Sequence, residues 1–398
     1  MYIRGCLYEA PPFFNYTLRN TNMHNLENSN NTLQNLLVTV QNQAARAVDF
    51  LAPTNQLQLV TGDDGADGKV SQIVIEAAGG EPTKTLAANG VAFNQISTKA
   101  GIDVRTAARL QQNYPAEFDG VINAIWDKEP ATRMIRTHMG QSDNHGIARA
   151  FVSDRFKTFD NVHLLNSALP QLMESDAQWQ VVQGTVTDQQ LYIRLKSLVH
   201  TGEGAAVGDA MALGMGLSNS EVGMGSVNVY QMVYTLVCLN GMQSGNKSRS
   251  SHITGSRGDT DTWGLLTDEA KNADNRALEL KVRDLVASYG SRDSFDLVLE
   301  KMRSAATDIV ESGSVAVENL GKVLTLTKKD TAKVMEGLIQ TMSQAGYAGR
   351  PVSRASLVNA VTAAAHTVDA DSIDDWQKLG GRVLDLPKAD WARVAAAA

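Results

Sequence analysis

The sequence contains very little cysteine and has no long apolar run. Cys6 and Cys238 are the only cysteines among 398 residues, and the difference between their surroundings argues against a disulfide and for a reducing compartment. No stretch approaches the roughly 18 uninterrupted apolar residues of a membrane helix. The first residues also lack the basic-then-apolar pattern of a secretion signal. Together these absences predict a cytoplasmic protein without a membrane partner.

Motifs for metal binding and nucleotide hydrolysis are missing as well. The seven histidines are scattered, and none stands at an HxxxH or HExxH spacing. The glycine-rich segment 202–210 lacks the lysine and the serine or threonine that end a phosphate loop. Glu221 with His200 or His252 would be a possible acid–base pair, although loop and surface roles explain these residues as well. We therefore predict no metal, no cofactor and no catalytic residue, and favour binding over catalysis.

Composition and charge restrict the kind of partner. Hydrophobic residues make up 43% of the chain and charged residues 20%, as is normal for a globular protein. At this length we expect two domains, or one core with a helical appendage. The formal net charge is −7, so any contact with nucleic acid must come from a local basic patch.

The longest apolar stretch that also contains turn residues runs from Gly216 to Met242. Glycine, serine and asparagine in its first half predict tight turns between extended pieces. The second half recurs at helical spacing, although alternation from Val227 to Val233 also permits a buried strand. We expect a short strand, a short buried helix that contains Cys238 and ends at Asn240-Gly241, and a new strand from Met242.

The remainder of the chain divides into a leader, a mixed core and a helical end. Residues 1–31 show no clean period and are expected to be a disordered or misassigned leader, with Met23 as an alternative start. Residues 32–262 predict an α+β core domain whose sheet is mainly antiparallel, and residues 263–398 an all-helical region that serves as a lid or in oligomerisation. The expected elements before the central stretch are a helix at Thr32–Phe50, strands at Gln56–Val60 and Lys69–Glu76, helices within Leu86–Trp126, strands at Thr132–Thr137 and Ile147–Val152, and a hairpin of Trp179–Val186 and Gln190–Leu198.

Two basic segments are the candidate binding residues. In the first, Arg149, Arg155 and Lys157 alternate with phenylalanines such as Phe156. Arginine for phosphates and phenylalanine for base stacking is the combination that a single-strand groove requires. The alternative is that the phenylalanines belong to the core and the bases to a solvated face.

The second segment, residues 244–258, contains basic residues and no acid. Its bases Lys247, Arg249 and Arg257 lie among serines and glycines, which predicts an exposed loop able to bind phosphate. A plain surface loop is the other interpretation.

With these segments in place, the chain resembles a known family. SNSEVGMG…LVCLNGM (Ser218–Met242), preceded by IARAFVSDRFKTFDN (Ile147–Asn161) and followed by SLVNAVTAAAH (Ser356–His366), is similar to the phage/plasmid-like protein family. That family (domain of unknown function 932) occurs in phages, prophages and plasmids, and the similarity runs from about Phe93 to Gly381. It implies no catalytic residues. The motif residues that it marks are Asn219, Ser220, Glu221, Gly223, Cys238, Asn240 and Gly241.

These observations leave three functional hypotheses. The first is a homo-oligomeric protein that binds single-stranded DNA or RNA, of the strand-annealing type that phages use in recombination. The second is a phage or plasmid enzyme, or a host-takeover factor, with a small-ligand site at the glycine-rich turn. The third is a scaffold protein without a ligand. The two basic segments favour the first.

Overall fold

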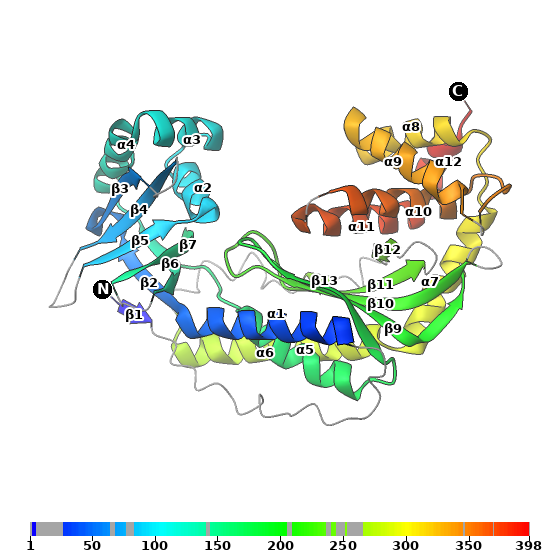
Figure 1. Ribbon diagram of the computed structural model, residues 1–398, viewed down its shortest axis with the longest axis horizontal. Coiled ribbons are helices and arrows are strands. Elements are labelled where there is room, and N and C mark those ends of the chain that lie inside the picture. Colours follow the sequence, from blue (N-terminus) through cyan, green and yellow to red (C-terminus); the bar gives the residue numbers. More distant parts are fainter. Residues whose placement is uncertain are drawn as a thin grey trace.

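The protein is a mixed α and β structure in which two sheets precede a group of C-terminal helices (Figure 1). The computed structural model describes residues 2–4, 27–63, 68–76, 83–140, 144–204, 209–235, 240–243, 251–252, 266–344, 347–368 and 370–397. The predicted class, α+β with mainly antiparallel sheets followed by a helical region, is confirmed. Among the described helices, none is long and apolar enough to cross a membrane.

The first sheet has seven strands in the order β1-β2-β6-β7-β5-β4-β3. All neighbours are antiparallel except β5 and β7, which are parallel. Three helices and β6 lie between these two strands in the chain, which gives the long connection that parallel neighbours need. The strands are β1 Tyr2–Arg4, β2 Ala47–Pro53, β3 Leu57–Asp63, β4 Lys69–Ile75, β5 Lys84–Ala88, β6 Thr132–Met139 and β7 His145–Ser153.

Three helices cover one face of this sheet (Figure 1). They are α2 Gly90–Lys99, α3 Val104–Asn113 and α4 Pro115–Lys128. The side chains of Asn89 and Asp103 accept backbone N–H bonds at the starts of α2 and α3, and Pro115 opens α4, where its missing N–H costs nothing. Phe118 and Ile122 are fully buried against the sheet. The helices expected within Leu86–Trp126 are thus present, and they pack as a core against the sheet.

The second sheet is an antiparallel meander in the order β12-β11-β10-β9-β8, with β13 paired to β11. Its strands are β8 Trp179–Val186, β9 Leu191–Glu203, β10 Ala210–Asn219, β11 Asn228–Thr235, β12 Asn240–Gln243 and β13 Ser251–His252. The predicted β8–β9 hairpin is confirmed. In β9, Ile193 and Leu195 belong to one core while Arg194 faces the other side of the sheet, as the alternation predicts.

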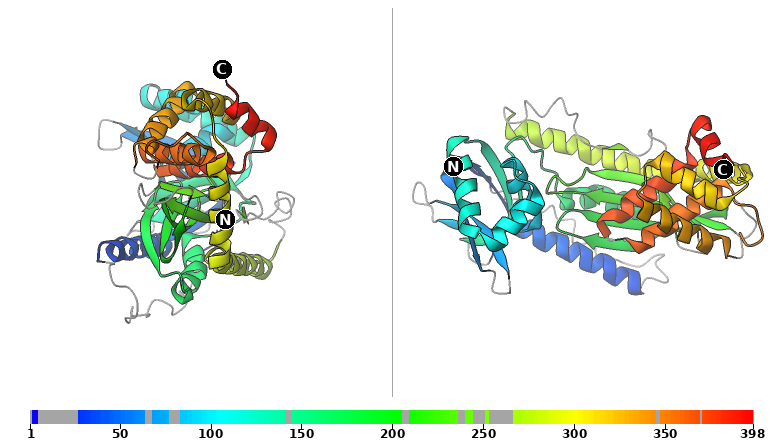
Figure 2. Two further views of the ribbon diagram at one scale, coloured as in Figure 1. Left: turned by 90° about the vertical axis from the view of Figure 1, so that its right-hand side faces the viewer. Right: turned by 90° about the horizontal axis from the view of Figure 1, so that it is seen from above.

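Helices cover both faces of the second sheet (Figures 1 and 2). Beneath it lie α1 Glu27–Arg46, α5 Asn161–Glu174 and α6 Asp268–Tyr289, with α1 against β8 and α6 against β11. Above it lie α10 Arg354–Ala364 and α11 Ala370–Leu384. The remaining helices are α7 Arg292–Thr307, α8 Gly313–Leu324, α9 Lys328–Met342 and α12 Lys388–Ala395.

Three boundary predictions need correction. The helix expected at Thr32–Phe50 ends at Arg46, because Ala47–Pro53 forms β2 inside the first sheet. The helix expected after Val229 is wrong within Asn228–Thr235, where β11 pairs on both sides and buries both faces. Asn240 and Gly241 do not end an element; they begin β12.

The predicted leader contains two elements of the fold. Tyr2–Arg4 pairs with Leu51, Phe50 and Asp49 of β2, and α1 begins at Glu27. Residues 5–26 and Cys238, predicted to be a buried thiol, lie outside the described residues.

A buried ion pair fastens α11 to the second sheet. Arg194 on β9 is 2% exposed and donates to Asp374 at 2.5 Å and to Gln183 at 2.6 Å. The hydroxyl of Tyr230 on β11 donates to the same Asp374 oxygen at 2.7 Å. Burial first, and then the neighbouring Asp374 carboxylate, raise the pKa of Tyr230, so this hydroxyl stays protonated as a donor. The C-terminal helices are thus part of the core of the second sheet.

Asp374→Ala should lower the free energy of unfolding by about 3–5 kcal/mol, because Arg194 would remain buried without its counter-charge. The adjacent Asp375 offers a matched control, since its side chain is 78% exposed and, among the described residues, pairs with Lys378 alone. Asp375→Ala should cost less than about 1 kcal/mol. Urea denaturation followed by circular dichroism measures both values. Equal losses in the two variants would contradict the role given to Asp374.

Candidate functional site

The turn between β10 and β11 connects the second sheet to the first. Its Val222 is 3% exposed and packs in a cluster with Met134 and Val152 of the first sheet. Gly223 has a φ of +78°, and a Cβ added there would lie 3.2 Å from the ring of Phe156. Glycine meets both demands of this position, a left-handed backbone and close contact with an aromatic ring. The turn therefore joins the two sheets through packed contacts. We call this region, formed by residues 219–224 and the side chains that contact them, the joint.

Arg136 on β6 is the most buried charge of this joint, at 2% exposure. Its three nitrogens donate to Asp49 on β2 at 3.0 Å, to Asp160 before α5 at 2.7 Å, and to the carbonyl of Glu221 at 2.7 Å. Burial alone would lower the pKa of Arg136, but the carboxylates of Asp160, Asp49 and Glu221 outweigh burial and raise it. One guanidinium thus holds together three segments that are far apart in the sequence.

Glu221 forms a second buried charge pair beside the first. Its Oε2 accepts from Arg149 on β7 at 2.6 Å, and its Oε1 accepts from the backbone N–H of Asn161 at 2.7 Å. Asn161 is the first residue of α5, where free N–H groups and the helix dipole favour a negative charge. Glu221 therefore links the first sheet to the helix layer beneath the second.

Arg149 also donates to Nε2 of His138 at 2.6 Å, so this ring nitrogen must carry a lone pair. Burial, and then the positive charges of Arg149, Arg46 and Arg136, lower the pKa of His138 to about 3. The imidazole is consequently neutral at physiological pH and serves as a hydrogen-bond acceptor.

Two further residues of the predicted family motif, Asn219 and Ser220, belong to the joint. Asn219 donates to the Phe159 carbonyl and to Oδ1 of Asn161, both at 2.9 Å. Ser220 donates to the Gln189 carbonyl at 2.7 Å and accepts from the N–H of Met224 at 2.9 Å. The sequence Asn219-Ser220-Glu221 thus fixes the turn to α5 and to the β8–β9 hairpin.

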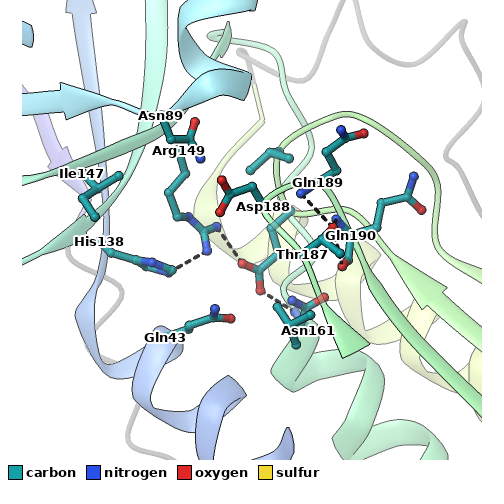
Figure 3. A pocket seen from close by; sticks show the side chains of 13 residues that line it. Gln43, Asn89, His138, Ile147, Arg149, Asn161, Thr187, Asp188, Gln189 and Gln190 are labelled. Carbon is teal, nitrogen blue, oxygen red and sulfur yellow. Dashed lines mark hydrogen bonds and ion pairs between the residues drawn. The ribbon is translucent and has the colours of Figure 1, made fainter. Parts of the chain in front are cut away.

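A polar pocket lies over these groups, between α1, the first sheet and the tip of the β8–β9 hairpin (Figure 3). Arg149, Glu221 and the neutral His138 line one side of it, and Asp188 is an exposed acid of the hairpin tip. Its apolar residues are Ile147, Val186 and Val222; its carboxamides are Gln43, Asn89, Asn161, Gln189 and Gln190. Inside the pocket the main charges cancel, so it suits a polar ligand of low net charge.

The structure separates the four predicted residues of the first basic segment. The prediction that Arg149 binds a phosphate needs correction. Its side chain is buried, with the residue 9% exposed, and its charge is neutralised by Glu221. Phe156 is half-buried against the turn, and Lys157 forms an ion pair with Asp274 of α6. Arg155 is exposed. Of the three cations in this segment, Arg155 is the most exposed.

Within the second basic segment, the structure describes only Ser251 and His252. Lys247, Arg249 and Arg257 lie outside the described residues. Ser251 and His252, between them in the sequence, form β13 and pair with Val229 and Asn228 at the start of β11. This is the end of β11 that follows the turn packed on Phe156. The strand inside the second basic segment thus lies at the same end of the sheet as the first.

Several residues of the joint and its pocket had no signal in the sequence. Arg136, Gln43 and Asn89 belong to no recognisable motif of the sequence. Gln43 and Asn89 line one pocket with His138 and Glu221 only after strands distant in the sequence have paired. Within the described residues, no group of three or more histidine, cysteine or acidic side chains is arranged to hold a metal ion.

Comparisons with family models, with curated proteins and with solved structures found no match to this chain. The resemblance to the phage/plasmid-like family therefore remains a proposal.

Lowering the pH should destabilise the joint through His138. Its pKa is about 3 in the fold and about 6.5 in an unfolded chain. Between these values the unfolded chain binds the extra proton, so stability falls as pH drops, by at most about 1.4 kcal/mol per pH unit. His138→Gln keeps an acceptor for Arg149 without titrating, and should flatten this slope. Urea unfolding at several pH values below 6.5 tests it.

The control for this prediction is His145→Gln, because His145 is exposed on the neighbouring strand. It should leave the slope of stability against pH as in the unmodified protein. A His138→Gln variant with the unmodified slope would show that His138 accepts protons freely in the fold.

Proposed function

We propose that this chain is a cytoplasmic protein of a phage or plasmid that binds single-stranded nucleic acid, self-associates, and acts in strand annealing. The observation that carries the proposal is the position of β13. Its pairing with Asn228 and Val229 brings the strand within the second basic segment to the end of the sheet where Arg155 and Phe156 lie. A polyanion can be held by a chain of net negative charge only where bases gather locally.

The exposed charges near the joint support the same proposal. Arg46, at the end of α1, is exposed and close enough to His138 to lower its pKa. Arg155 is exposed on the segment between β7 and α5. The ion pair of Arg149 and Glu221 has no net charge, so it does not attract a polyanion. Phosphate binding in this proposal therefore rests on Arg46, Arg155 and the second basic segment.

Affinity for a labelled single strand should fall steeply with salt, because each neutralised phosphate releases counterions. The expected slope of log affinity against log salt is roughly −0.7 for each phosphate contact on a single strand. The triple variant Lys247→Gln, Arg249→Gln, Arg257→Gln should flatten the slope by about two units and weaken binding. Fluorescence anisotropy across a salt series measures both effects.

A matched control removes three bases far from the joint. Lys328, Lys329 and Lys388 are exposed on α9 and α12, and their change to glutamine alters the net charge equally. This control should keep the original salt slope. Equal flattening in both triple variants would mean that overall charge, and not the proposed site, governs binding. Absence of binding by the unmodified protein at low salt would end the proposal.

A second candidate function is binding of a small polar molecule. The observation that favours it is the pocket itself, whose lining is rich in carboxamides and whose central charges are paired. Such a molecule would bind with little dependence on salt, since no phosphate charge is neutralised. A salt-independent affinity for a small ligand, without affinity for a strand, would select this function.

A further inference from the structure

The pocket over Arg149 and Glu221 has more hydrogen-bonding capacity than the protein uses. The side-chain amides of Gln43 and Gln189 make no hydrogen bond to any described residue, and both line the pocket (Figure 3). Nε of Arg149 is buried and is likewise without a partner among the described residues. A buried donor left unpaired costs free energy, and the amides of Gln43 and Gln189 leave this site with unused donors and acceptors.

Other amides present one free group after their structural bond is made. Asn89 accepts from the N–H of Ala92 to cap α2, and Asn161 accepts from Asn219, while the NH₂ group of each has no bond to another described residue. Gln190 donates to the carbonyl of Met224, which leaves its oxygen as an acceptor. Donors and acceptors therefore both line the pocket, from α1, the first sheet and the β8–β9 hairpin.

The walls of the pocket add an apolar surface. Ile147 is 49% exposed at the pocket, although it lies on a strand of the first sheet. Val186 of β8 and the buried Val222 of the turn also line the pocket. A planar group could be covered by aliphatic side chains while its edge meets carboxamides.

We infer that this pocket binds a neutral nucleobase and recognises its hydrogen-bonding edge. Carboxamides pair with the donor and acceptor pattern of a base edge, and apolar side chains cover its faces. A phosphate is disfavoured here because Glu221 already satisfies the Arg149 charge and Asp188 adds a negative charge. The base comes either from a bound strand, in which case the inference rests on the proposed function, or from a free nucleoside.

The test compares a labelled single strand with a strand of the same length that carries abasic sites. The unmodified protein should bind the normal strand roughly tenfold more tightly than the abasic one. Gln43→Ala and Gln189→Ala should each remove most of this preference while the salt slope stays unchanged. Gln34→Ala, at an exposed position of the same α1, is the control and should keep the preference.

Free nucleosides in the same assay and in calorimetry separate the two sources of the base. Nucleoside binding that Gln43→Ala weakens, without strand binding, would support the pocket while ending the proposed function. Equal binding of normal and abasic strands, with no nucleoside binding, would overturn this inference and leave the proposed function standing. An unmodified protein that binds neither strand nor nucleoside would overturn both. Thermal melting of each variant confirms that the fold is kept.

Discussion

The contact between Arg149 and Glu221 is the interaction on which the arrangement of the two sheets depends. Two charges that are each nearly out of water are tolerated only when they are paired and hydrogen-bonded. Glu221 meets Arg149 with one oxygen and the first N–H of α5 with the other. Because these partners belong to different layers, the turn can satisfy its carboxylate only when both layers are in place.

Arg136 extends the same constraint to two more strands, β6 and β2. Each of its three nitrogens donates one hydrogen bond, to Asp49, to Asp160 and to the carbonyl of Glu221. A planar fork with several donors suits such a junction better than a lysine would. The result is a joint with fixed geometry, and the pocket above it inherits that geometry. Side chains held in place by neighbouring bonds are what a selective binding site requires.

Much of the fold follows from the sequence, because it depends on local patterns. In the β8–β9 hairpin, β9 places Ile193 and Leu195 on one face and Arg194 on the other, although β8 has a register shift between Val181 and Gln183. The C-terminal helices show helical periodicity with caps such as Ser353. In β11 the apolar residues fit the helical period of 3.6 and the strand period of 2, so the sequence pattern predicts a helix as well as a strand. In the sheet both faces of β11 are buried, so no polar alternation remained to decide between them.

The site could be predicted only in part, for the same reason. Glu221 and its neighbours stood out as an acid in an apolar, turn-rich stretch. The local sequence predicts Arg149 as a phosphate ligand. Its actual partner, Glu221, lies 72 residues away in the sequence, so no local pattern reveals the ion pair. Gln43 and Asn89 are ordinary residues of a helix and a helix cap until strand pairing brings them over the same pocket.

A double-mutant cycle on Arg149 and Glu221 tests this account most directly. Arg149→Met and Glu221→Gln should each lower the free energy of unfolding by about 3–5 kcal/mol, because each leaves its partner buried and uncompensated. The double variant should lose clearly less than the sum, with a coupling energy of up to about 3 kcal/mol. Losses that simply add would show that the two side chains act independently. The joint would then not depend on their contact.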